Sequence, residues 1–203
     1  MATYTTVSIC NKALVLCGAS PITALTDNTA NARALNDVFE ISRKSFLTEC
    51  RWTFALTRST LATVATTTFG FLYDEEAYAY TRPSNALRIW QMSDIEAIWR
   101  EEGDYIISNT ASLGTLYTWD HDVVGLWRQK AVDAFIDKLC SDICFMILNS
   151  GTKAQAFLEK YERITLPKAM ADDSQTGTHQ EPIDDYWLKS KYGSEGNPAR
   201  SYS

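Results

Sequence analysis

An apolar stripe that begins near Asp122 constrains the fold of this chain more than any other feature of its sequence. Its members are Val124, Trp127, Ala131, Phe135, Leu139, Ile143 and Met146, each three or four residues after the one before. This spacing matches the period of an α-helix and puts the side chains on one face. We expect that face to be buried against Leu14, Val38 and Phe46, and the helix to end at residues 149–151, Asn-Ser-Gly.

Two shorter apolar stripes precede it and predict a helical hairpin. In residues 6–17 the apolar positions are Ile9, Cys10, Ala13, Leu14 and Cys17, and Gly18 and Pro21 then stop the helix. The second helix runs to about Cys50, with an inward stripe of Ala34, Leu35, Val38, Phe39, Ser42 and Phe46 and an outward face of Arg33, Asp37, Glu40, Arg43 and Lys44. A short connector at residues 21–28 makes the two helices an antiparallel pair.

The middle third of the chain is predicted to be rich in β-structure. Residues 57–68 are rich in threonine and lack a helical pattern, so we expect an extended connection or loop there. From Phe69 to Trp119 the content of aromatic and β-branched residues is high, and residues 77–80 and 87–92 alternate in the manner of strands. A turn at Gly103 predicts a β-hairpin in this region.

A last helix is expected from residue 152 to about 171, kinked or split by Pro167. The predicted fold class is therefore α+β and mainly α, with a four-helix core, a β-rich middle insertion and an extended C-terminal arm. The expected segments are the helical hairpin in 1–60, the β-rich insertion in 61–120, the C-terminal helices of the core in 121–172 and the arm in 173–203.

The C-terminal arm has a composition that cannot bury a core by itself, because it is rich in Gly, Pro, Ser, acids and amides. It nevertheless carries one aromatic cluster, a combination typical of a docking segment that becomes ordered against a partner. The residues predicted to bind that partner are Tyr186, Trp187, Leu188, Lys189, Lys191 and Tyr192.

Composition and charge exclude several classes of protein. The 203 residues carry a formal net charge of −6, which argues against a protein whose main task is to grip phosphates. The five cysteines are an odd number, and their spacing indicates reduced, buried thiols. The N-terminus has no basic segment followed by a long apolar one, so we expect no secretory signal, and no stretch is long and apolar enough for a membrane span.

Candidate catalytic and metal-binding residues are few. The chain has two histidines, His121 and His179, and no cysteine pair with zinc-ligand spacing. Adjacent carboxylates occur at residues 75–76, 101–102, 172–173 and 184–185, but neighbours in a strand face opposite ways, and solvated turns explain them. The phosphate-binding, dinucleotide-binding and serine-nucleophile motifs are absent. We therefore expect no enzymatic activity, no catalytic residue, no cofactor and no metal.

The beginning of the chain shows a family pattern. It is formed by the run Ile9-Cys10-Asn11-Lys12-Ala13-Leu14, followed by Gly18-Ala19, Ile22 and Leu25-Thr26-Asp27, the Ala-rich residues 30–34 with a late Arg43, and the run Trp52-Thr53-Phe54-Ala55-Leu56-Thr57-Arg58. This order and spacing resembles the head-to-tail adaptor proteins of tailed phages, also called tail tubular protein A or head-completion and tail accessory proteins. The resemblance covers residues 6–61, and it extends to the later helix and to residues 187–193 of the C-terminal arm.

The resemblance implies a structural protein of the virion, assembled in the host cytoplasm, whose four-helix part is an adaptor core. Such adaptors form a dodecameric ring that binds the portal protein above and the tail nozzle or tail tube below. They extend the channel through which the genomic DNA leaves, without binding it specifically, and they involve no membrane in their soluble state. A net negative charge fits a conduit, because a basic lumen would hold phosphates.

Two other functions stay open at this level. The first is a tail-associated cell-wall hydrolase, since some phage tail components act on peptidoglycan; lytic activity lost on removal of one carboxylate would favour it. The second is a small globular host protein with a flexible tail, against which the N-terminal resemblance argues.

Overall fold

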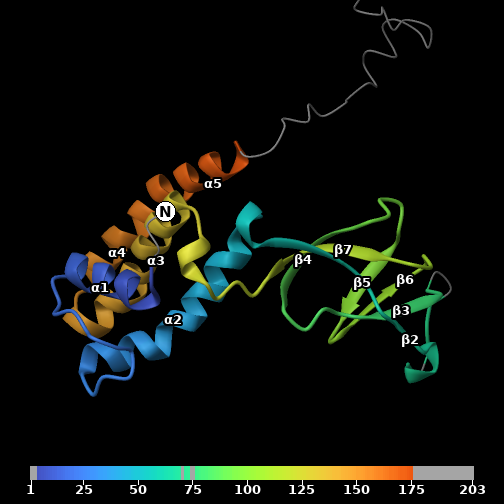
Figure 1. Cartoon of the computed structure of the whole chain (residues 1–203), viewed down its shortest axis with the longest axis horizontal. Helices are drawn as coiled ribbons and strands as arrows, with labels where there is room; N and C mark the ends of the chain where they lie inside the picture. The colour runs from blue at the N-terminus through green and yellow to red at the C-terminus, as the bar shows by residue number, and fades with distance from the viewer. Residues whose placement is uncertain (1–3, 70, 74–75, 176–203) are drawn as a thin grey trace, which may run out of the picture.

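The computed structural model describes residues 4–69, 71–73 and 76–175. Helices gather at one end of an elongated molecule and strands at the other (Figure 1). The helical body consists of α1 (Thr6–Cys17), α2 (Ala30–Glu49), α3 (Gln129–Leu148), α4 (Gly151–Lys160), the π-helical turn η4 (Tyr161–Thr165) and α5 (Leu166–Ser174). The sheet body consists of β1 (Leu56–Thr60), β2 (Thr63–Val64), β3 (Tyr78–Thr81), β4 (Ala86–Met92), β5 (Trp99–Glu102), β6 (Tyr105–Ser108) and β7 (Gly114–Trp119).

The predicted N-terminal hairpin is confirmed, with its ends fixed by local side chains. Thr5 caps α1 and exchanges hydrogen bonds with Ser8, whose hydroxyl accepts from the Thr5 amide at 3.0 Å. Gly18 ends the helix in a left-handed conformation with φ of 86°, which glycine adopts without steric cost. Thr29 caps α2, and its hydroxyl accepts a hydrogen bond from the Ala32 amide at 3.2 Å.

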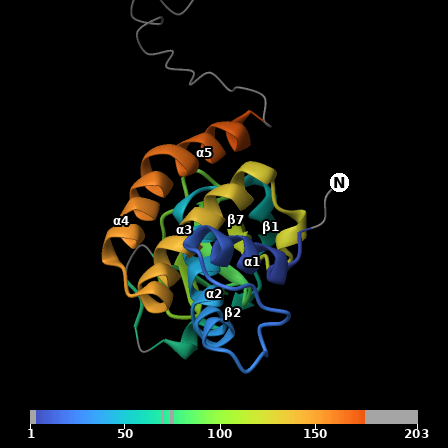
Figure 2. The same cartoon turned by 90° about the vertical axis from the view of Figure 1, so that its left-hand side faces the viewer.

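The stripe on α3 forms the centre of the helical body, as predicted, except that Met146, its last member, is 53% exposed. In the view along that body (Figure 2), α3 lies among α1, α2, α4 and α5, and it packs against all four. The Phe46 ring lies 5.5 Å from the Phe135 ring and 5.6 Å from the Trp127 ring, centroid to centroid. The helix itself begins later than expected, because a 3-10 turn, η3 (Val124–Leu126), occupies the first part of the stripe. Asn149, with φ of 52°, ends it at the predicted place.

The last helix changes its hydrogen-bonding pattern immediately before Pro167. A proline has no amide hydrogen to donate and its ring crowds the preceding turn, so a regular α-helix cannot continue through it. Here the chain widens into η4 and returns to α-helix at Leu166. The expected kink or split is therefore a single π-turn between α4 and α5.

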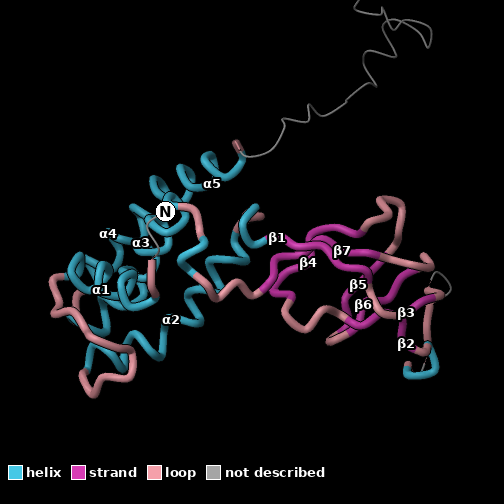
Figure 3. Tube along the Cα trace, in the orientation of Figure 1, coloured by secondary structure: helices cyan, strands magenta, loops and turns pink. Residues whose placement is uncertain are grey.

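The strands form two antiparallel sheets (Figure 3). One has the order β1-β7-β4, and the other has the order β2-β3-β6-β5. The predicted hairpin is confirmed: β5 pairs with β6 so that Glu102 lies opposite Tyr105, and Gly103 takes φ of 57° in the turn. The sheets enclose a second hydrophobic core made of Leu61, Tyr80, Ala86, Ile89, Met92, Ile106, Leu113 and Tyr117.

This second core corrects the predicted fold class. The fold is α+β, with half of the described residues helical and 19% in strands, and the expectation of a mainly α fold built on a four-helix adaptor core is wrong. The β-structure is not an appendage of the helices, because it buries its own apolar side chains. Part of the error is local: residues 57–68, expected as a connection or loop, supply β1 and β2, whose threonines suit a pleated, half-buried surface.

The boundary predicted for the C-terminal arm is also shifted. Helix α5 continues to Ser174, so residues 173 and 174 belong to the helical body. Residues 176–203, which include all six predicted partner-binding positions, lie outside the described residues.

All five cysteines are free and buried, as predicted. Cys140 and Cys144 lie one turn apart in α3, and burial raises the pKa of the Cys10 thiol to about 12. We expect almost no alkylation of the native protein without reductant, and five modified sites after denaturation, counted by intact mass. A disulfide between Cys140 and Cys144 would contradict this, because it would distort the regular helix that holds both residues.

Candidate functional site

The far end of the helical body carries exposed apolar side chains. Helix α1 runs parallel to α3: the Tyr4 hydroxyl donates to Gln129 at the start of α3, and Cys17, the last residue of α1, lies against the Cys140 carbonyl in the second half of α3. The ends of both helices therefore lie at the same end of the body, away from the sheets (Figure 1). The exposed apolar side chains there are Val15, Leu16, Phe145 and Met146, each 45% exposed or more. We call these four residues the apolar end.

A groove of about 330 Å³ adjoins the apolar end. It is lined by Leu16, Lys153, Ala156, Phe157 and Lys160. Lys160 is fixed beside it, since its ammonium lies 2.8 Å from the carboxylate of buried Asp137. Apolar surface bordered by charged side chains is typical of a surface that contacts another protein.

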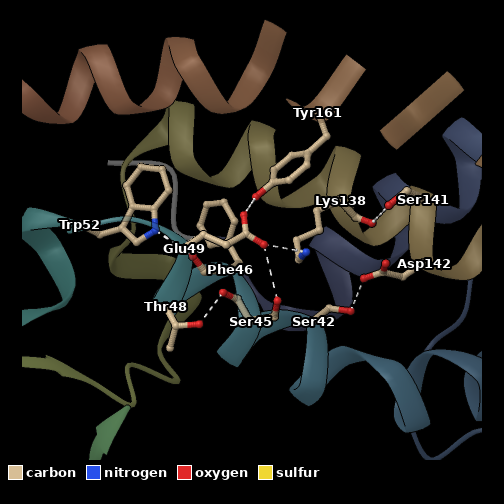
Figure 4. A network of polar contacts seen from close by, with 10 residues as sticks. All are labelled: Ser42, Ser45, Phe46, Thr48, Glu49, Trp52, Lys138, Ser141, Asp142 and Tyr161. Atoms are coloured by element: carbon tan, nitrogen blue, oxygen red, sulfur yellow. Dashed lines mark hydrogen bonds and ion pairs between the residues drawn. The ribbon is translucent and has the colours of Figure 1, made fainter. Parts of the chain in front are cut away.

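A partly buried polar network joins α2, α3 and η4 (Figure 4). The Tyr161 hydroxyl donates to Glu49, whose carboxylate also lies 2.9 Å from the Lys138 ammonium. Burial, together with the neighbouring Glu49 carboxylate, raises the pKa of Tyr161, so the phenol stays protonated. On the next turns, Ser42 donates to Asp142. These groups bond to one another where three helices meet, so we interpret the network as one that holds the helices together.

A second charged cluster connects the helical body to the sheet body. Arg43 of α2 is buried, and its guanidinium lies 2.7 Å from Glu40 and 2.7 Å from Asp120, which follows β7 directly. The sequence pattern placed Arg43 on the outward face of its helix. This was wrong for Arg43, because the chain just after β7 packs against it, whereas Arg33, Asp37, Glu40 and Lys44 on the same face are exposed. Burial opposes ionisation of Asp120, but hydrogen bonds from Arg43 and Lys44 outweigh it and hold the pKa of Asp120 below its usual value.

His121 lies beside this cluster and is buried. Its ring stacks on Trp119, with centroids 4.3 Å apart and planes at 18°. Burial lowers the pKa of His121, so the folded protein holds the imidazole neutral.

This arrangement predicts that acidification destabilises the protein. An unfolded histidine becomes protonated near pH 6.5, whereas folded His121 does so only at lower pH, so stability present above pH 6.5 is lost as the pH falls. We expect the urea midpoint to fall between pH 7.5 and 5.5, and His121→Phe, which keeps the stacking on Trp119, to reduce that slope. His179→Gln is the matched control. An equal slope in wild type and His121→Phe would contradict the prediction.

A cavity of about 650 Å³ lies over one face of the β1-β7-β4 sheet. Its lining is polar and basic: Arg51, Arg58, Ser59, Thr60, Gln91, Met92, Ser93, Gly114, Thr115 and Leu116. Neither this groove nor the one beside the apolar end is lined by an Asp, Glu, His or Cys. The sequence prediction missed this groove because it treated residues 57–68 as a loop. The available signal was the strand-like spacing of Arg58 and Thr60, two residues apart on one face.

Comparison with known proteins gives no assignment: no protein-family model matches the chain, and neither does any curated protein sequence. Within residues 4–69, 71–73 and 76–175, no group of His, Cys, Asp and Glu side chains is arranged to hold a metal ion. No helix in that same part of the chain has the length and the apolar run needed to cross a bilayer.

Proposed function

We propose that this chain is a head-to-tail adaptor subunit of a tailed phage, which forms a ring between portal and tail and extends the DNA exit channel. The observation that carries the proposal is the order and spacing of residues 9–27 and 52–58. Both runs contribute to one core, since Cys10 and Leu14 of the first and Trp52 and Ala55 of the second are fully or almost fully buried in the helical body. The residues that carry the family resemblance are therefore also residues that stabilise the helical body.

The elongated shape supports a connecting role. A subunit with a helical body at one end and a sheet body at the other offers two chemically different surfaces to two partners (Figure 1). In the proposed assembly those partners are the portal protein and the tail nozzle or tail tube, with the virion as the final location and the host cytoplasm as the place of assembly.

The apolar end supports assembly into a ring. A closed ring of identical subunits needs a heterologous interface, in which two different patches of each copy meet. Exposed Val15, Leu16, Phe145 and Met146 provide apolar area for one such patch. Twelve copies, the number implied by the family resemblance, would then surround a lumen through which DNA passes without specific binding. The net charge of −6 is compatible with that passage.

The proposal is tested by mixing the purified chain with the portal protein of the same phage and imaging both by negative stain. We expect rings in the presence of portal, and weaker rings for Phe145→Glu than for the control Glu159→Lys on an exposed face of α4. Failure of the chain to bind the portal would overturn the proposed function.

The C-terminal arm gives a second prediction within the same proposal. We expect deletion of residues 180–203 to leave the subunit folded, because both cores lie before residue 176. The same deletion is expected to weaken or abolish portal binding, and Trp187→Ala to do so less severely, because a large aromatic anchor is lost. Light scattering of the mixtures measures this. Unchanged binding by the truncated chain would mean that the helical body alone makes the contact.

A further inference from the structure

The outer edge of β1 is open in the described part of the chain. β1 is the terminal strand of the β1-β7-β4 sheet, and its only strand partner there is β7. Just after β1, the Leu61 amide donates to the Leu113 carbonyl at 2.9 Å, in the same register as the β1–β7 pairs. Bonded and non-bonded residues alternate along an antiparallel pair, so the backbone groups of Arg58 and Thr60 point away from β7. Such an edge is a template for a further strand.

The groove next to this edge suits a negatively charged ligand. Arg51 and Arg58 both line it, no carboxylate does, and neither arginine is in an ion pair with a described residue. Arg58 of β1 pairs with Leu116 of β7, which in turn pairs with Gln91 of β4. All three line the groove, so the guanidinium of Arg58 stands over this face of the sheet. An extended segment with carboxylates can therefore use both the backbone edge and the two cations.

The described chain ends beside the start of β1. The Asp173 carboxylate accepts hydrogen bonds from the Thr53 amide and hydroxyl, each at 2.7 Å, and Thr53 lies three residues before the first residue of β1. Two residues after Asp173, the C-terminal arm continues from Gln175. Asp184 comes nine positions after Gln175, a span of up to about 30 Å, while Thr53 to Arg58 spans at most about 17 Å. The arm is long enough to run alongside β1.

We propose that residues 183–188 of the C-terminal arm, Ile-Asp-Asp-Tyr-Trp-Leu, add to the open edge of β1 in the same chain as a parallel strand. Successive side chains of a strand face opposite sides, so one of Asp184 and Asp185 faces the groove and pairs with Arg58 or Arg51. The aromatic residues that follow favour extended pairing. The short tether favours the chain's own arm over a second copy, because it holds the segment at a high effective concentration.

This contact would keep the C-terminal arm from binding a partner while it is paired with β1. Its predicted partner-binding residues would be held on the subunit's own sheet until a partner displaces them. This inference concerns the isolated subunit, so it does not depend on the proposed ring, and its test needs no other protein.

The test is amide hydrogen exchange of the full-length chain, followed residue by residue by NMR. We expect the amides of Arg58 and Thr60 to exchange about tenfold faster in Asp184→Lys/Asp185→Lys than in wild type, because the added strand opens. The amides of Thr57 and Ser59, which bond to β7, report on folding within the same strand and are expected not to change. Arg58→Asp combined with the two lysine substitutions should restore part of the protection, whereas the control Arg33→Asp with the same lysines should not.

Two results would overturn the inference. One is equal exchange at Arg58 and Thr60 in wild type and in the Asp184→Lys/Asp185→Lys variant. The other is protection that increases with protein concentration and accompanies dimers in light scattering, because the occupant of the edge would then be a second copy.

Discussion

Replacing Phe135 by alanine is expected to lower the free energy of unfolding by about 3–5 kcal/mol. The side chain is completely buried at the centre of the helical body, and its ring contacts those of Phe39, Phe46 and Trp127 at centroid distances of 5.4–5.6 Å. Truncation removes these contacts and leaves a cavity among rigid rings that cannot collapse around it. In a chain of this size the change corresponds to a fall in Tm of about 10 °C, measured by calorimetry.

Phe145→Ala is the matched control for that experiment. Phe145 lies in the same helix but is 58% exposed, so its truncation is expected to change stability by less than about 0.5 kcal/mol. If both variants melted at the wild-type temperature, Phe135 would not be at the centre of the core, and the arrangement of α3 against α2 would be incorrect.

Periodicity was a sufficient guide to the helical body. The stripes on α1, α2 and α3 are regular and long, and α1 and α3 end at Gly18 and Asn149, which take left-handed conformations. Apolar spacing of that kind leaves one face to bury, and the predicted packing of Phe46 on Phe135 and Trp127 follows from it. The start of α3 was missed because η3 places Val124 and Trp127 in the same core without an α-helix.

The sheet body was harder to predict because its strands are short and pair over long distances. β1 pairs with β7 across more than fifty residues of sequence, and no local pattern reveals that partner. Without the pairing, the threonines of residues 57–68 are indistinguishable from those of a polar loop. The prediction therefore treated the β-structure as an insertion and missed both the second core and the basic groove on the β1-β7-β4 sheet.

The candidate sites show the same limit. The outward placement of Arg43 followed correctly from the helical period, but a helix in contact with both a helical layer and a sheet has more than one buried face. Docking of the sheet body turned that arginine into a buried ion-pair partner of Asp120. Sequence patterns report which residues share a face, and they do not report what covers it.

Replacing Arg43 by methionine is expected to cost about 2–4 kcal/mol, because removal of one partner of a buried ion pair leaves the other charge poorly compensated. The Arg43 side chain is 2% exposed and bonds to Asp120 and Glu40, each at 2.7 Å. Methionine keeps the length of the side chain, so lost volume is a small part of the effect. Asp120 remains 27% exposed and keeps Lys44 at 3.2 Å, which places the expected cost below that of a fully buried pair.

A double-mutant cycle separates the ion pair from packing. Asp120→Asn should also destabilise the protein, and Arg43→Met/Asp120→Asn should cost less than the sum of the two single changes, because the unpaired charge is then absent. Arg43 and Asp120 join the helical body to the sheet body. We therefore also expect the two bodies of Arg43→Met to unfold in two separate transitions in urea, one followed by fluorescence and one by far-UV circular dichroism. A single transition with additive energies would mean that the sheet body is held to α2 by other contacts, of which the 2.8 Å hydrogen bond from Arg88 to the Thr48 carbonyl is the first to test.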